Sequence, residues 1–297
     1  MDMLTFHRSL IFDEVGQEAF RQAIFAAVKG GETVVDIGTG TGIHAMFACQ
    51  AGASKIYAIE QDPIIQLARE NCNRNGFSDR IEFIQGRAEA VTLPERGNLL
   101  TIHMGILDTI YLVSHVRDKF LVAGGTVIPA ALELFCAPIS SKAIYEVIYT
   151  WDSMRWGLDF TAARNLARIS THAFRIESHE LLSRGQSIAP IDLQTITTPL
   201  VDRCVEIEIQ SDGVLHGFGL WFVEQLYGDI TISTAPPCKL PLALWPNRFF
   251  PAIEPITVKA GDMALFHLTI FGSDSTRLWD WSISVLNKHG TPKCQSV

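Results

Sequence analysis

The chain has 297 residues, a formal net charge of −8 and an ordinary apolar content, which fits one large or two modest globular domains. The acidic balance argues against a nucleic-acid-binding protein, which normally carries an excess of basic residues. The six cysteines are scattered without a CxxC pair, so we predict neither a metal site nor a disulfide framework. Because we find no apolar signal core and no run near the ~18 apolar residues of a membrane span, we expect a cytoplasmic protein without a membrane partner.

The first predicted element is an amphipathic helix over 14–28, where apolar side chains from Phe20 to Val28 recur at helical spacing. A Gly-Gly pair ends it. A helix in front of the first strand covers a ligand pocket in one interpretation and is ordinary packing in the other. We treat residues 1–30 as an N-terminal helical lid.

The stretch from Thr33 to Gly42 reads TVVDIGTGTG. Its apolar run predicts a buried strand that ends at Asp36, and Gly38, Gly40 and Gly42 follow at every second position. A strand, a glycine-rich turn and a helix begin a nucleotide-binding βαβ unit, because glycine lets the backbone approach a ligand closely. An unliganded glycine-rich turn is the alternative.

The residues around the glycines indicate which nucleotide is bound. A dinucleotide fingerprint needs a glycine where this chain has Ile43, and the lysine of a P-loop is absent. Asp36 would repel a pyrophosphate but would pair with an ammonium group, and S-adenosylmethionine joins such a group to a nucleoside. Glu60 ends a second apolar strand about 20 residues later, where an acid accepts hydrogen bonds from ribose hydroxyls. An ordinary surface glutamate is the alternative.

Two further strands lead to the same edge of the predicted sheet. Residues 80–85 alternate as a strand, and Ala88 and Glu89 follow it. Ligands of parallel sheets lie outside the carboxyl ends of the strands, so Glu89 or its neighbouring backbone would contact an adenine amino group. A solvated acid in a turn is the alternative.

The fourth strand, over 99–102, brings His103 and Met104 to the reactive end of the cofactor. His103 is a candidate general base, since the pKa of histidine lies near working pH. A histidine satisfied by a backbone partner is the alternative. Asp108 either orients His103 or caps the helix that follows.

After a fifth strand that ends at Pro129, the pattern changes to short strands separated by Pro and Gly turns, which predicts antiparallel β structure. A more helical insertion interrupts these strands near 151–176. We therefore expect a Rossmann-like domain over 31–129 and an antiparallel domain over 130–297.

The order of these features resembles that of the protein arginine methyltransferases over nearly the whole chain. VVDIGTGTGIHAMFACQAGASKIYAIEQD is similar to the family's cofactor motif, and RDKFLVAGGTVIPAALELFCAPI to the crossing into its β-barrel domain. The resemblance implies a Rossmann-like class I methyltransferase domain followed by an antiparallel β-barrel, with S-adenosylmethionine as cofactor and S-adenosylhomocysteine as product. The candidate catalytic residues remain His103 and Asp108, which follow from their place at the tip of the fourth strand. The implied cofactor contacts are Asp36, Gly38, Thr39, Gly40, Gly42, Glu60, Gln61, Ala88, Glu89 and Met104.

The departures from the family concern its substrate residues. The family holds the arginine guanidinium with two glutamates on a hairpin after the fourth strand, but here Ile102 occupies the first position and no glutamate follows in the hairpin. Leu244 replaces the histidine before Trp245 in the barrel. The lid arginine that grips the cofactor carboxylate is Gly16 here, and Arg21 is a possible substitute.

Cofactor residues are thus retained while substrate residues are lost. We expect an S-adenosylmethionine-dependent methyltransferase that acts on an O, N or C nucleophile of a small molecule or peptide, in specialised metabolism. The alternatives are an arginine methyltransferase with displaced acids and an inactive methyltransferase-like scaffold; Asp36 and Ile43 disfavour an NAD-dependent dehydrogenase. The resemblance also implies a homodimer formed through an arm at 151–176. The acids available for displacement are Glu133, Glu146, Asp152 and Asp159.

Overall fold

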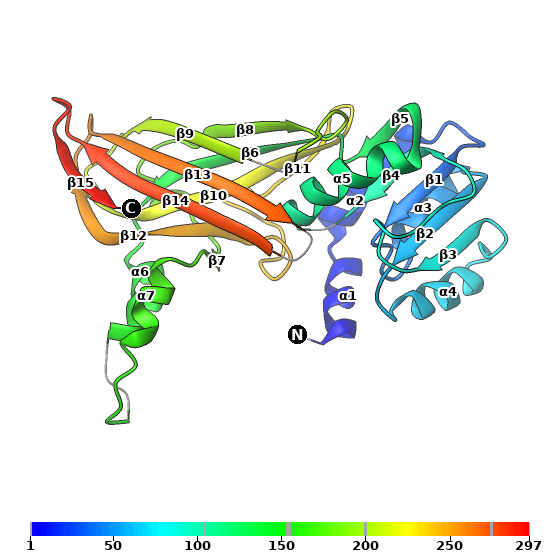
Figure 1. Cartoon of the computed structure of the whole chain (residues 1–297), viewed down its shortest axis with the longest axis horizontal. Helices are drawn as coiled ribbons and strands as arrows, with labels where there is room; N and C mark the ends of the chain where they lie inside the picture. The colour runs from blue at the N-terminus through cyan, green and yellow to red at the C-terminus, as the bar shows by residue number, and fades with distance from the viewer. Residues whose placement is uncertain (1, 104, 153–155, 199–200, 274–275, 297) are drawn as a thin grey trace. The chain divides into compact units, whose positions relative to one another are not determined.

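The structure is a computed structural model that describes residues 2–103, 105–152, 156–198, 201–273 and 276–296. The chain forms two compact units, each described by itself below (Figure 1). Unit 1 comprises Met1–Leu132, Ile191–Pro199 and Glu224–Ile232, and unit 2 comprises the rest. The two later segments of unit 1 come from the half that the sequence assigns wholly to the second domain.

Unit 1 is built on a five-stranded sheet in the order β3-β2-β1-β4-β5. All its pairings are parallel, and four of the five residues of β1 are buried, as expected for a strand covered on both faces. The order reverses between β1 and β4, which makes the carboxyl end of this pair the binding edge of such a sheet. The predicted Rossmann-like architecture is confirmed. The strands are β1 (Thr33–Ile37), β2 (Lys55–Glu60), β3 (Ile81–Gln85), β4 (Gly97–Ile102) and β5 (Leu121–Ile128).

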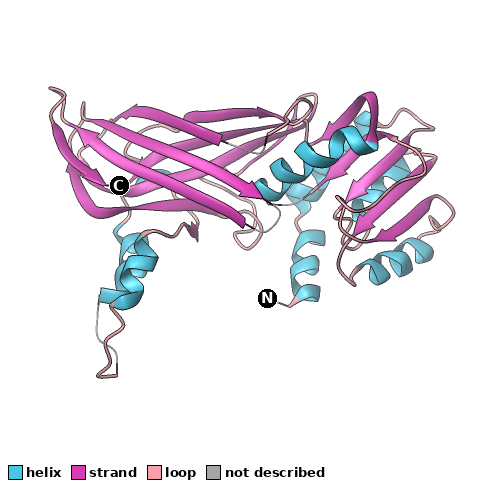
Figure 2. Cartoon of the chain, viewed as in Figure 1, coloured by secondary structure: helices cyan, strands magenta, loops and turns pink. Residues whose placement is uncertain are grey.

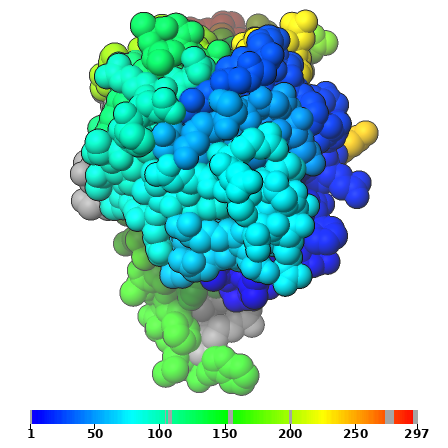
Figure 3. All heavy atoms as spheres, turned by 90° about the vertical axis from the view of Figure 1, so that its right-hand side faces the viewer, coloured from blue at the N-terminus to red at the C-terminus, as the bar shows by residue number. Residues whose placement is uncertain are grey.

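Two helices precede the sheet, although the sequence predicts only the second. Asp2 caps α1 by accepting the N–H of Thr5 at 2.9 Å, and Asp13 caps α2 by accepting the N–H of Gly16 at 3.2 Å. Phe20 of α2 is completely buried. Figure 3 shows one face of unit 1, formed by the early part of the chain in blue and cyan. The helices of this unit are α1 (Met3–Ile11), α2 (Glu14–Ala27), α3 (Ile43–Ala51), α4 (Ile65–Arg74) and α5 (Ile106–Phe120).

Unit 2 consists mainly of strands (Figure 2). They form a six-stranded and a four-stranded sheet, and the pairings of β9, β13, β14 and β15 are antiparallel. The predicted antiparallel character is confirmed, while the described strands lie in two separate sheets where the resemblance implies one barrel. The strands that build these sheets are β6 (Ala131–Ile139), β7 (His172–Phe174), β8 (Gln186–Asp192), β9 (Val201–Glu208), β10 (Gly213–Tyr227), β11 (Ile230–Ser233), β12 (Asn247–Val258), β13 (Met263–Ser273), β14 (Thr276–Leu286) and β15 (Pro292–Ser296).

The helical insertion of unit 2 begins earlier than the sequence predicts. It contains α6 (Lys142–Ile148), the 3-10 turn Tyr149–Asp152 and α7 (Ala162–Arg168). A capping hydrogen bond from the N–H of Ile144 to the Ser141 hydroxyl, 3.3 Å long, fixes the start of α6. Within the described ranges, none of the helices has the length and apolarity needed to cross a lipid bilayer.

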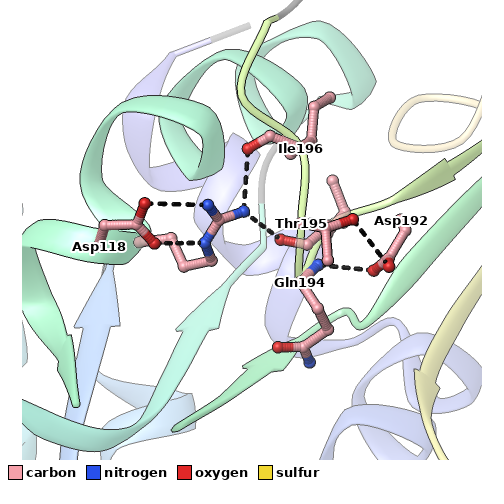
Figure 4. Close-up of polar contacts among 7 residues, drawn as sticks. Asp118, Asp192, Gln194, Thr195 and Ile196 are labelled. Atoms are coloured by element: carbon pink, nitrogen blue, oxygen red, sulfur yellow. Dashed lines mark hydrogen bonds and ion pairs between the residues drawn. The ribbon is translucent and has the colours of Figure 1, made fainter. Parts of the chain in front are cut away.

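Arg117 joins the end of α5 to the segment Ile191–Pro199, which unit 1 takes from the later half of the chain (Figure 4). Its Nη1 donates to the carbonyls of Ile196 at 2.9 Å and Leu193 at 3.4 Å, while Nε and Nη2 donate to Asp118. The Asp192 carboxylate folds the same segment by accepting from Gln194 N and Thr195 Oγ1. The buried guanidinium thus helps to hold this segment on unit 1, together with the hydrogen bond from the N–H of Leu193 to the carbonyl of Ala130 at 3.0 Å.

Candidate active site

Asp36 lies at the end of β1 and is buried. Its Oδ2 accepts a hydrogen bond from the Thr39 hydroxyl at 2.6 Å, and its Oδ1 accepts one from the Thr101 hydroxyl at 2.7 Å. Burial raises the pKa of Asp36, while these hydroxyls act in the opposite direction. The carboxylate therefore holds the glycine turn of β1 against the neighbouring strand β4. Pairing of Asp36 with a ligand ammonium stays a prediction.

Gly40 and Glu60 meet at the carboxyl edge of the sheet, where β1 and β2 end. Glu60 ends β2, and its Oε2 accepts the N–H of Gly40 at 3.0 Å while its Oε1 accepts the N–H of Asp62 at 3.0 Å. Gly40 has φ +54°, and a Cβ there would lie 2.9 Å from Cε1 of His7 on α1. The positive φ favours glycine here, and any larger residue would also require the ring of His7 to shift. The sequence predicts both the glycine and the acid, but it gives no local sign of His7.

The other two glycines of the motif have the same backbone requirement. Gly38 and Gly42 have φ of 69° and 87°, in the left-handed region. The N–H groups of Gly38 and Thr39 donate to the carbonyl of Ile59 at 2.9 and 3.1 Å, which ties the turn to β2. The motif is therefore a fixed cradle at the carboxyl edge, in the position where nucleotide ligands bind parallel sheets.

His103 at the tip of β4 belongs to a cluster of three rings. Its ring centre lies 4.4 Å from that of Phe20 and 5.3 Å from that of His44, and Phe20 and His44 are 4.6 Å apart. Burial, together with the neighbouring His44, lowers the pKa of His103 to about 3, and burial lowers that of His44 to about 4. His44 is held by Gln17, 3.2 Å away. At neutral pH both imidazoles are uncharged, so His103 is a weak base.

The predicted adenine-side residues lie at the end of β3. Ala88 is buried, and Glu89 forms an ion pair of 3.0 Å with Arg87. Lys119 on α5 donates to the carbonyl of Glu89 at 2.8 Å, which fixes this turn against the helix. Gln61 is exposed directly after β2. The contacts of these residues with a cofactor stay predictions.

Four further residues bear on the predicted site: Met104, Asp108, Ile102 and Arg21. Met104 lies outside the described residues, and Asp108 lies in α5 with its side chain outside the description. Ile102 is completely buried at the end of β4, so it presents no charge to the site. Arg21, considered as a substitute for the lid arginine, pairs with Glu18 at 2.8 Å on the exposed face of α2.

Comparison with known proteins gives a family for each part of the chain. Residues 20–127 match the family described as ribosomal protein L11 methyltransferase (PrmA), and residues 132–297 match the PRMT5 oligomerisation domain. The chain is 29% identical over 252 residues to protein arginine N-methyltransferase 6 of Xenopus laevis, covering 78% of this chain and 74% of the relative. It is 29% identical over 250 residues to protein arginine N-methyltransferase 1 of Dictyostelium discoideum, covering 78% and 72%.

Solved structures show the same fold. A chain of the Trypanosoma brucei PRMT1 enzyme-prozyme heterotetrameric complex with AdoHcy superposes with a TM-score of 0.85 at 21% identity, covering 98% of this chain and 96% of that one. Arabidopsis thaliana protein arginine methyltransferase 10 gives a TM-score of 0.81 at 21% identity, with 99% and 96% covered. The parallel sheet, the glycine cradle and these matches define a class I methyltransferase that uses S-adenosylmethionine. The chain belongs to the protein arginine methyltransferase family.

Proposed function

We propose that the chain transfers a methyl group from S-adenosylmethionine to a nitrogen of an arginine side chain in a protein or peptide. The observation that carries this proposal is the Gly40–Glu60 cradle at the carboxyl edge of the sheet, in a chain that matches a family of the arginine methyltransferases. The relatives bear the name protein arginine N-methyltransferase, which favours a peptide acceptor. No finding supports the small-molecule acceptor that the sequence favours.

The described residues fit the cofactor. The free lone pairs of the Glu60 carboxylate are available to ribose hydroxyls, and the turn at Ala88 and Glu89 is available to the adenine. S-adenosylmethionine supplies an activated methyl group when bound, so the protein contributes mainly by positioning the acceptor. An uncharged His103 would not repel a sulfonium.

A second candidate function is a subunit that binds the cofactor without transferring its methyl group. The observation that favours it is Ile102, which is buried and apolar where a charged acceptor would need a partner. One of the similar structures is a complex of an enzyme with a prozyme, so such a subunit has a precedent in the fold.

The test is calorimetric titration of the full chain with S-adenosylhomocysteine. We expect the wild type to bind it and Glu60→Gln to bind about tenfold more weakly, because charge-assisted hydrogen bonds to the ribose become neutral ones. Glu82→Gln is the matched control, since Glu82 is exposed on β3 and pairs with Lys55 at 2.8 Å. A wild type that does not bind would contradict the proposal.

Radiolabelled methyl transfer to arginine-rich peptides then separates the two candidates. Incorporation of label into arginine supports the enzyme. Tight binding of S-adenosylhomocysteine without incorporation into any acceptor, alone or with a copurified partner, supports the non-transferring subunit.

We also infer a homodimer. Residues 132–297 match an oligomerisation domain, and the helical insertion exposes large apolar side chains. Leu166 and Ile169 on and after α7 are 66% and 68% exposed, and Trp156 is 94% exposed. Apolar side chains gathered on a projecting segment typically mark a protein interface.

A further inference from the structure

Glu224 in β10 is a buried carboxylate whose Oε2 has no hydrogen-bond partner among the described residues. The residue is 3% exposed, and burial alone raises the pKa of its carboxyl to about 8. The other buried acids of unit 1 differ from it, because Asp13, Asp36 and Glu60 each accept at least one hydrogen bond. Glu224 therefore lacks the partner that burial of a charge ordinarily demands.

The backbone brings β10 next to the segment that follows β5, at the carboxyl edge of the parallel sheet. Thr101 of β4 pairs with Ile128 of β5 in parallel. The segments that follow these two strands, which contain His103 and Ala130, therefore leave the sheet at the same edge. The N–H of Ala130 donates to the carbonyl of Gln225 at 2.7 Å. Glu224 is thus one residue from a backbone contact with the segment that follows β5, and both segments belong to unit 1.

The alternation of β10 determines which face carries the carboxyl group. Leu226 is completely buried, whereas Gln225 is exposed and donates from Nε2 to the carbonyl of Gly228 at 2.8 Å. Glu224 shares the buried face with Leu226, because successive side chains of a strand alternate. An apolar residue would pack on this face without the cost of desolvating a carboxyl group. Binding of a cation to the carboxyl group would offset this cost.

We propose that Glu224 is the carboxylate that pairs with the cationic nitrogen group of the methyl acceptor. The proposal rests on the proposed function and names the residue that recognises the acceptor's charge. It accounts for a cationic acceptor beside Ile102, which provides no charge at the tip of β4. A guanidinium supplies the donors that the orphaned Oε2 lacks, and the bond is charge-assisted once Glu224 is ionised.

The test compares two peptides that differ only in charge. Gly-Gly-Arg-Gly-Gly and its citrulline analogue, a neutral isostere, are titrated into the full chain saturated with S-adenosylhomocysteine. We expect the wild type to prefer the arginine peptide by about tenfold or more, and Glu224→Gln to lose that preference. Glu82→Gln should keep it, because Glu82 lies on the exposed side of β3.

The controls separate this proposal from the proposed function. Glu224→Gln should bind S-adenosylhomocysteine as the wild type does, and Glu224→Leu provides a second variant if the amide fails to fold. A wild type that binds S-adenosylhomocysteine but shows no preference for arginine, or a Glu224→Gln variant that retains the preference, would overturn the role of Glu224 alone. Absent binding of S-adenosylhomocysteine to the wild type would instead contradict the methyltransferase proposal.

Discussion

Asp36 and Glu224 are both buried acids, but their surroundings give them different roles. Asp36 accepts two threonine hydroxyls, so its carboxylate is part of the framework of the glycine turn. Glu224 has one buried oxygen, Oε2, without a hydrogen-bond partner among the described residues. A buried group with satisfied hydrogen bonds stabilises one conformation, whereas an unsatisfied group is kept for binding or chemistry.

Stability should therefore depend on pH through Glu224. Its pKa is raised from 4.5 to about 8 in the folded state, so the native chain holds a proton that the unfolded chain has released between these values. The contribution of Glu224 to the free energy of unfolding is fully present below pH 4.5. It falls by about 1.4 kcal/mol per pH unit as pH rises to about 8. Urea unfolding of the wild type and Glu224→Gln should show this loss only in the wild type.

The imidazoles do not obscure this comparison. The pKa values of His44 and His103 are lowered to about 4 and 3, so they favour the folded state above pH 6.5 and lose that contribution as pH falls. Both residues are present in the two proteins, and their effect cancels in the difference. Equal pH slopes for the wild type and the variant would contradict the buried, unpaired state of Glu224.

Local spacing was enough to predict that Asp36, Gly40 and Glu60 lie at the carboxyl edge of the parallel sheet. Asp36, Gly40 and Glu60 follow one another in a fixed pattern because strand, turn and strand are consecutive in the chain. His7 and Glu224 could not be predicted, since one comes from a short leading helix and the other from a strand in the later half. Only the folded chain brings them to unit 1.

At the scale of elements, periodicity predicted α2 and the five parallel strands. It missed α1, whose nine residues contain no buried side chain and whose start depends on the Asp2 cap. It also missed β6, because the apolar run after Pro129 resembles β5 in composition, although β6 pairs with strands of another sheet. Pairing partners, unlike periodicity, are not encoded locally.

Arg117 provides a prediction for α5. Replacing it with methionine leaves the carbonyls of Leu193 and Ile196 without the donor that they have in the structure. We expect a loss of about 2–4 kcal/mol in the free energy of unfolding, measured by urea denaturation. Asp118→Asn is the matched control and should cost under about 1 kcal/mol, because the Asp118 side chain is 81% exposed. Equal losses for both variants would show that Arg117 acts through the ion pair.

At the scale of the whole molecule, the exposed apolar side chains of the helical insertion provide a test of assembly. Leu166→Glu should convert the proposed dimer to a monomer in sedimentation equilibrium, since it places a charge on a surface that the dimer would bury. Asp159→Lys is a control on the same insertion, where the exposed carboxylate accepts the N–H of Thr161. A monomeric wild type, or a dimeric Leu166→Glu variant, would contradict the inferred dimer.

The sequence predicted the two architectures but not the composition of the units. The sequence pattern changes near residue 129, because helices alternate with strands before this residue and strands dominate after it. No change in the sequence pattern marks the two later segments of unit 1, Ile191–Pro199 and Glu224–Ile232. They belong to unit 1 through contacts such as those of Arg117 and Ala130. Tertiary contacts of this kind are decided by packing and not by local pattern.

This membership has a consequence during synthesis on the ribosome. The parallel sheet is complete in sequence at Ile128, yet unit 1 also includes residues as late as Ile232. Domains generally fold as units while the chain emerges, from the N-terminus onward. The last segment of unit 1 therefore leaves the ribosome only after more than half of unit 2 has been translated, so unit 1 gains its final contacts late in synthesis.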